Sequence, residues 1–400
     1  MICDSGLASP ARITGPSSLD DGGAWPNLVR KRTVRPHLTS RDRTALYLWL
    51  ITRLGIVAIA LIASSVYVRG NLQDPFLERF TQWDVDHFIE IARYGYSGNP
   101  SNPPDAGLPG FFPGLPLLIW AVHLIVPDWR LSALLISLVA GAVAMVALAR
   151  LGDQEGAEGS GTRAVAALLL SPFAVFLFAG YSEALFLAFA LPAWMLARRR
   201  RWELAAVYAF FGAGIRVTGL FLAVALIVEF LAHDRRWRKA PWLLVPFLAP
   251  LSYFAYLWWW SRGDLNAWQH AQERGWGRRT VDPWQALETT WNAAFGPPNQ
   301  FTGAFRVELI AAALGVLLTL WLLWRRRWAE FSYVGLQMAA LLTSAFYLSI
   351  GRSSLMWWPL WLMIGGLGVR RPWMYRVLLV AMIPFLAVET IKFTEGSWAG

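Results

Sequence analysis

Three side chains that can take part in acid–base chemistry lie within four residues of an otherwise apolar chain. The stretch "QWDVDHFIEIARYGY", residues 82–96, holds Asp84, Asp86 and His87. A correctly placed carboxylate can act as a general base and take a proton from an attacking hydroxyl group. The two aspartates also form a D-x-D spacing, which can hold a metal ion. The elements around this stretch must decide which chemistry applies.

The stretch itself predicts a short amphipathic helix, which offers the same side chains purely structural roles. Asp84 suits the N-cap position, and Asp86 in the first turn would favour the helix dipole. Trp83 and Phe88 stand at the two positions of a hydrophobic staple. The capping and the catalytic interpretations of Asp84 are therefore both open from the local sequence.

The composition indicates that this helix lies at a membrane. Of the 400 residues, 56% are hydrophobic, which is too apolar for a water-soluble fold of this length. Several runs approach the ~20 apolar residues needed to cross a bilayer, for example 131–149, 242–260 and 303–324. The sequence predicts an all-α polytopic membrane protein and excludes a soluble single domain.

The formal net charge of +10 is carried largely by short basic clusters between the apolar runs. The clusters are "RRRR" at 198–201, "RRWRK" at 235–239, "RRR" at 325–327 and "RR" at 370–371. Cytoplasmic loops carry an excess of Lys and Arg, so this placement predicts topology anchors and argues against a nucleic-acid partner. The single cysteine, Cys3, excludes an internal disulfide.

The basic clusters also set the sidedness of the chain. Residues 1–43 are rich in Gly, Ser, Pro and Arg and predict a disordered basic cytoplasmic tail. The transmembrane domain then covers 44–392 and begins with an outward helix over 44–68. The stretch 69–130 becomes a long first extracytoplasmic loop, in which 111–127 lies along the membrane surface. Only this placement of 111–127 brings every basic cluster to the cytoplasmic side.

The remaining apolar runs alternate across the bilayer and bring the total to about eleven transmembrane helices. A second extracytoplasmic loop covers 261–302. The runs after the first helix are 131–150, 163–179, 182–197, 203–215, 218–232, 241–260, 303–324, 330–349, 354–369 and 373–391. This threading gathers polar residues of varied type at the outer face, which predicts a site there.

Four further segments contribute to that face, namely "GYSE" (180–183), "GIRVTG" (214–219), "WQHAQERGWGRR" (268–279) and "IGRSS" (350–354). Arg216 lies between two apolar runs, where an unpaired cation is unfavourable, so a phosphate partner is favoured. Glu183 either binds sugar or lies in a solvated turn. The candidate substrate-binding residues are His87, Glu183, Arg216, His270, Gln272, Arg274 and Arg352, of which the three from 270–274 are otherwise ordinary loop residues.

These residues supply what glycosyl transfer from a lipid-linked phosphate sugar requires. A base must take the proton of the acceptor hydroxyl, cations must stabilise the departing phosphate, and a groove must hold polyprenyl chains. Asp84 or Asp86 would be the base, while arginines and aromatic walls supply the rest. No metal is expected, because a phosphate already linked to lipid has less need of one and a fourth ligand is missing.

Several segments resemble, in the same order, the phosphatidylinositol-glycan class V (PIG-V) mannosyltransferases of the GT-C glycosyltransferase superfamily. They span about residues 45–370 and comprise "QWDVDHFIEIARYGY" followed by "FFPGLPLL", then "SPFAVFLFAGYSEALFL", "GIRVTGLFL", "WQHAQERGWGR" and "LSIGRSSLMWWPLW". The resemblance implies a GT-C-type bundle with juxtamembrane helices in the first extracytoplasmic loop. It also implies a lipid-phosphate-mannose donor and a catalytic acid in that loop, where Asp84 matches the "WD" position.

The sequence thus predicts an integral-membrane mannosyltransferase that inverts configuration by general-base catalysis and needs no cofactor. Mannose would pass from polyprenyl-phosphate-mannose to a glycolipid or glycan acceptor at the extracytoplasmic face of the cell membrane, or of the endoplasmic reticulum membrane in a eukaryote. Two departures from the family pattern are the longer segment 97–110 and Ser353, which stands where a tyrosine is expected after Arg352.

Three alternative functions are a transporter or flippase for polyprenyl-phosphate-linked sugars or lipids, a GT-C enzyme with another polyprenyl-phosphate sugar, and a non-catalytic assembly subunit. Transporters tend to show inverted repeats and charged groups near the middle of the membrane. Here no repeat is visible, and the polar groups gather at one face.

Overall fold

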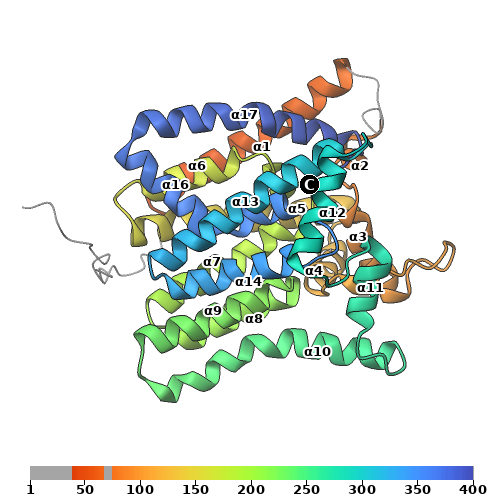
Figure 1. Cartoon of the computed structure of the whole chain (residues 1–400), viewed down its shortest axis with the longest axis horizontal. Coiled ribbons are helices and arrows are strands. Elements are labelled where there is room, and N and C mark those ends of the chain that lie inside the picture. The colour runs from red at the N-terminus through yellow and green to blue at the C-terminus, as the bar shows by residue number, and fades with distance from the viewer. Residues whose placement is uncertain (1–37, 67–73, 400) are drawn as a thin grey trace, which may run out of the picture.

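Apolar helices lie side by side along one common direction in the computed structural model of the chain, which describes residues 38–66 and 74–399 (Figure 1). The bundle extends from α17 and α1 at one edge to α10 at the other. Within the described ranges there is no strand, and the one isolated β-bridge joins Thr280 to Ser344. Helices suit such apolar runs because they satisfy every backbone hydrogen bond internally, as a hydrocarbon environment requires.

Five helical segments among the described residues are long and apolar enough to cross a membrane. They are α1 (Ser40–Val66), α5 (Trp129–Glu155), the η5–α10 segment (Trp237–Trp260), α13 (Thr302–Trp324) and α17 (Pro372–Thr394). The predicted all-α polytopic membrane fold is confirmed. The count of eleven spans stays a prediction, and of the predicted tail only 38–43 is described, with α1 already beginning at Ser40.

Shorter helices fill the interior of the bundle, and α7 packs between α5 and α8. These helices are α6 (Ser160–Leu169), α7 (Ser182–Arg198), α8 (Trp202–Ile215), α9 (Thr218–His233), α14 (Trp328–Leu342) and α16 (Trp358–Arg370). Two predicted runs are wrong as continuous helices. The run 163–179 breaks after α6 because Pro172 disfavours helix in the residue before it, and 330–349 ends as helix at Leu342, after which the chain turns into the site.

Short helices gather at one end of the bundle, where Figure 1 labels α2 (Phe76–Arg79), α3 (Asp84–Tyr94), α4 (Gly114–His123), α11 (Ala267–Trp276) and α12 (Pro283–Phe295). With ten residues, α4 is about 15 Å long and cannot cross a hydrocarbon core of about 30 Å. Local capping rules set several boundaries at this end. Asp128 accepts a hydrogen bond from the Leu131 amide and caps α5, and Asp282 caps α12 before Pro283.

The basic clusters meet at the opposite end, where ion pairs join them to acidic residues. Arg198 lies 2.7 Å from Glu229, and Arg327 lies 2.7 Å from Glu155. The side chain of Arg236 donates to the carbonyl of Arg200. The predicted clustering of these basic segments at one end is therefore present in the fold.

Small residues let α5 and α6 cross closely. A methyl group added to Gly161 would lie 1.8 Å from the carbonyl oxygen of Ala149, so only glycine fits there. Close crossings of this kind are typical of helices packed within membranes.

Candidate active site

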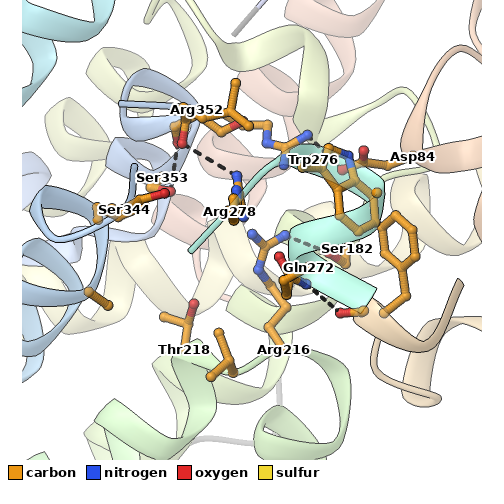
Figure 2. A pocket seen from close by; sticks show the side chains of 18 of the residues that line it. Asp84, Ser182, Arg216, Thr218, Gln272, Trp276, Arg278, Ser344, Arg352 and Ser353 are labelled. Atoms are coloured by element: carbon orange, nitrogen blue, oxygen red, sulfur yellow. Dashed lines mark hydrogen bonds and ion pairs between the residues drawn. The ribbon is translucent and has the colours of Figure 1, made fainter. Parts of the chain in front are cut away.

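A cavity of about 640 Å³ lies at the end of the bundle that carries the short helices (Figure 2). Its wall combines segments that are far apart in the sequence. The polar and aromatic lining includes Trp83, Asp84, His87, Tyr181, Ser182, Arg216, Thr218, Gln272, Trp276, Arg278, Arg279, Ser349, Arg352 and Trp398. The bundle thus brings together the first loop, two hairpin tips, the second loop and the chain just before α16.

Asp84 stands at the beginning of α3 and lines the cavity. The residue in the N-cap position is Trp83, and its side chain makes no capping hydrogen bond. Its φ of 60° is rare for a residue with a side chain of this size. The capping role predicted for Asp84 is therefore wrong, because the helix begins with that residue. The predicted staple is replaced by other ring contacts, since Trp83 packs edge-on against Trp398 and Phe88 against Phe111. Backbone strain of this kind is concentrated at functional sites.

Two arginines and two carboxylates form a continuous ion-pair network beside the cavity. Arg352 Nη1 lies 2.8 Å from Asp84 Oδ2, and Arg352 Nε lies 3.3 Å from Glu183 Oε1. Arg216 Nη1 donates to the same oxygen of Glu183 at 2.7 Å and to Ser182 Oγ at 2.6 Å. The charges of this network balance, so its two guanidinium groups already have carboxylate partners.

Glu183 holds the centre of that network but does not line the cavity. It is fully buried at the start of α7, so the alternative of a solvated turn is wrong. The rings of Tyr181 and Phe176 cover Arg352, with centroids 5.1 and 5.4 Å from its guanidinium carbon. The Tyr181 hydroxyl donates to the carbonyl of Gln82 and thereby ties this wall to the loop before α3.

Arg278 is a third guanidinium in the cavity wall and was not singled out from the sequence. Figure 2 shows it between Arg352 and Arg216. It donates to the carbonyl of Leu348 at 3.4 Å, and no carboxylate in the described part of the chain forms an ion pair with it. Burial and, to a smaller extent, the nearby Arg352 charge lower the pKa of Arg278 to about 10, so the group stays protonated near neutral pH.

The backbone around Arg278 is fixed by pairing between two loops. Gly277, with a φ of 64°, ends α11 in the left-handed conformation that suits glycine. The Ala345 amide then donates to the carbonyl of Arg279, and the Val281 amide to that of Thr343. In the sequence, the signal for Arg278 is the adjacent pair "RR" at 278–279, and such pairs also occur in ordinary basic loops.

The other predicted site residues divide into two groups. His87 lines the cavity with its Nδ1 2.9 Å from Asp105 Oδ2, and Gln272 lines it while donating to the carbonyl of Gly110. Three residues lie outside the cavity and are exposed, namely Asp86, His270 and Arg274. His270 is paired with Asp264 at 2.8 Å instead.

The D-x-D spacing does not produce a shared metal site, because Asp84 faces the cavity and pairs with Arg352 while Asp86 lies outside it. A different group, His87, Glu90 and Asp105, brings donor atoms within 4.8 Å of one another. Two of these carboxylates already bind backbone, since Glu90 accepts from the Asn99 amide and Asp105 from that of Gly107. The positions are therefore accounted for by hydrogen bonds within the first loop.

Comparison with known proteins supports the predicted resemblance. Residues 52–235 match the family model described as Mannosyltransferase (PIG-V). The resemblance to the PIG-V mannosyltransferases is confirmed. The matched PIG-V segment contains α3 to α9, and therefore Asp84, Glu183 and Arg216, whereas Arg278 and Arg352 lie beyond it.

Curated relatives are named GPI alpha-1,6-mannosyltransferase 2. The protein from Cricetulus griseus is 33% identical over 171 residues, which are 40% of this chain and 33% of that protein. The one from Homo sapiens is 35% identical over 171 residues, with the same 40% and 33% shares. The match thus spans about a third of the length of these relatives.

Two solved structures of ArnT from Cupriavidus metallidurans are also similar, each covering 83% of this chain and 62% of that protein. The apo form has a TM-score of 0.48 at 12% identity. The form bound to undecaprenyl phosphate has a TM-score of 0.46 at 14% identity.

Proposed function

We propose that this membrane protein transfers mannose from a polyprenyl-phosphate-mannose donor to a hydroxyl group of a glycolipid or glycan acceptor. One observation carries the proposal: a single cavity holds the Asp84 carboxylate and, on the same wall, the Arg278 guanidinium without a carboxylate partner among the described residues. The first is suited to accept a proton, and the second is suited to bind an anionic leaving group. The matched PIG-V segment supports mannose as the sugar.

Asp84 acts as the general base in this proposal. Arg352 holds its Oδ2 atom, and the other carboxylate oxygen accepts the proton of the acceptor hydroxyl. The deprotonated oxygen forms a bond to C1 of mannose on the face opposite the phosphate. The bond between C1 and the phosphate oxygen breaks, so the configuration at C1 inverts.

The leaving phosphate departs with the electron pair of the broken bond and gains negative charge. Arg278 binds this phosphate by charge-assisted hydrogen bonds, and Arg216 adds a second positive charge from the same wall. Glu183 touches neither substrate and keeps Arg216 and Arg352 in place. No metal is assigned a role in this scheme.

The placement of the cavity favours the extracytoplasmic face. The basic clusters lie at the other end of the bundle, and clusters of this kind face the cytoplasm. Exposed tryptophans near the cavity end, including Trp259 and Trp284, match the aromatic belt at a membrane interface. A polyprenyl chain would then lie in the outer leaflet while its phosphate enters the cavity.

The experiment is a transfer assay with purified protein in detergent and labelled polyprenyl-phosphate-mannose. The wild type should label a lipid acceptor, and Asp84→Asn should reduce the rate by roughly 10²-fold or more, because it removes the base at nearly constant volume. Asp86→Asn is the matched control, since Asp86 is exposed outside the cavity and should lose less. Thermal denaturation of each variant checks folding. Transfer by Asp84→Asn at the wild-type rate would rule out Asp84 as the base.

A further inference from the structure

A buried carboxylate from α13 binds the backbone that leads into Arg352. Glu308 is only 3% exposed, although α13 is apolar enough to span a membrane. Its Oε1 accepts from the Ser349 amide at 2.6 Å, and its Oε2 accepts from the amides of Ile350 at 2.7 Å and Gly351 at 3.4 Å. These three residues directly precede Arg352, so Glu308 holds the turn that presents this arginine to the site.

The backbone held by Glu308 has an unusual conformation. Ser349 has a φ of 62°, which is unfavourable for a residue with a side chain. A methyl group on Gly351 would lie 2.3 Å from the ring of Phe173, so this glycine is pressed against its neighbour. The charge-assisted hydrogen bonds from the carboxylate offset this strain.

A chain of direct contacts connects Glu308 to the proposed base. Glu308 fixes α15 (Ile350–Ser353), Arg352 projects from α15, and its Nη1 holds Asp84 Oδ2 at 2.8 Å. Carboxylate oxygens are needed at both ends of this chain because N–H groups donate at both ends. Glu308 does not line the cavity, so its effect on a substrate must pass through Arg352.

We infer that Glu308 is a positioning residue that orients Asp84 through α15 and Arg352. The inference rests on the proposed function, because it concerns how the proposed base is held. The presence of a carboxylate in an apolar span fits this role, since an ionisable group there is unfavourable unless specific interactions stabilise it.

Glu308→Gln tests the inference with little change in size. The new amide nitrogen cannot accept from a backbone N–H, so part of the cap is lost. A misplacement of about 1 Å at a reacting group can reduce rates about 10²-fold, so kcat should fall by about 10- to 100-fold, more than the donor KM changes. Glu330→Gln is the matched control, because Glu330 is also 3% exposed but pairs with Arg327 at the other end of the bundle; its kcat should stay near that of the wild type.

A double-mutant cycle separates positioning from a general structural defect. If Glu308 acts through Arg352, then Glu308→Gln should lower kcat no further in an Arg352→Ala background, since residues that act as a unit are not additive. Additive losses would overturn the inference. Should Glu308→Gln fail to accumulate in membranes, Glu308→Asp, which keeps the charge but is one methylene shorter, enters the same cycle.

Amide hydrogen exchange supplies a measurement that does not depend on activity. The peptide containing 349–353 should exchange faster in Glu308→Gln than in the wild type, because its amides lose an acceptor, and should be unchanged in Glu330→Gln. If the wild type transfers no mannose but this difference appears, the proposed function fails while the contact stands. Unchanged exchange in Glu308→Gln, or a kcat equal to that of the wild type, would overturn the inference.

Discussion

Replacing Arg278 by alanine is the sharpest test of how the cavity binds its donor. The wall contains three inward-facing guanidinium groups in a row, and those of Arg216 and Arg352 already bind Glu183 and Asp84. Arg278 donates to the backbone carbonyl of Leu348 at 3.4 Å and forms no ion pair with a carboxylate of the described residues. Among these three groups, the positive charge of Arg278 is the one that no described carboxylate neutralises, so it is suited to an incoming phosphate.

The expected magnitude follows from the type of bond that is lost. A hydrogen bond to a charged group contributes about 1.5–3 kcal/mol, and each ~1.4 kcal/mol corresponds to a factor of ten. Arg278→Ala should therefore lower kcat/KM for the donor by about 10- to 100-fold. Arg278→Lys keeps the charge but loses the planar fork, so its loss should be smaller, about three- to tenfold.

Initial rates of labelled mannose transfer over a range of donor concentrations give this kcat/KM. Arg274→Ala is the matched control, because Arg274 belongs to the same loop but is exposed and lies outside the cavity. Its kcat/KM should remain within about threefold of the wild type, as expected for an exposed charge. The reasoning is refuted if Arg278→Ala has normal kcat/KM, or if Arg274→Ala is equally impaired.

Three further predictions address the sidedness, the packing and the ion-pair network. In a background without Cys3, a cysteine in place of Ser101 should react with an impermeant thiol reagent in intact cells. A cysteine in place of Ala157 should react only after lysis, although both positions are exposed. The reverse pattern would invert the proposed topology. Gly161→Ala should destabilise the protein by about 1–3 kcal/mol or more, because the added methyl meets the α5 backbone, whereas Gly303→Ala, with open space around it, should leave the melting temperature unchanged or slightly raised. Equal melting temperatures would contradict the close α5–α6 crossing. Arg216→Lys should lower transfer at an unchanged protein level, because an ammonium in place of Nη1 at Glu183 and Ser182 lacks the Nε and Nη2 groups that the guanidinium keeps for the phosphate. Full activity would contradict the proposed role of Arg216.

Much of the site was predictable because its residues break strong local patterns. Asp84 lies in a polar stretch of an apolar chain, and Arg216 interrupts two apolar runs. Cations and carboxylates in such positions are unfavourable without a role, so their presence is informative. The structure places Asp84, Arg216 and Arg352 at one cavity.

Errors arose where position depends on backbone geometry rather than on residue type. Asp84 has the composition of an N-cap, but α3 begins at Asp84 itself because Trp83 adopts a φ of 60°. Asp86, two residues later, lies outside the cavity. Side chains two residues apart on an α-helix point about 200° apart, so Asp84 and Asp86 face different surroundings, and local sequence does not fix the start of a helix to within one or two residues.

The sequence by itself determined the environment and the class of this protein. The length of the apolar runs, the basic clusters and the order of the PIG-V-like segments depend only on composition and spacing. Insertion into a membrane depends directly on apolar length, and the orientation of the chain depends on where the basic residues lie. The partners of each charge were decided only by the tertiary structure. Whether a guanidinium is neutralised, as in Arg352, or available, as in Arg278, depends on which carboxylates the bundle brings within about 3 Å from segments hundreds of residues apart. The hydrogen bonds of Glu308 were likewise decided only by the tertiary structure, since its three amide partners lie more than forty residues away along the chain.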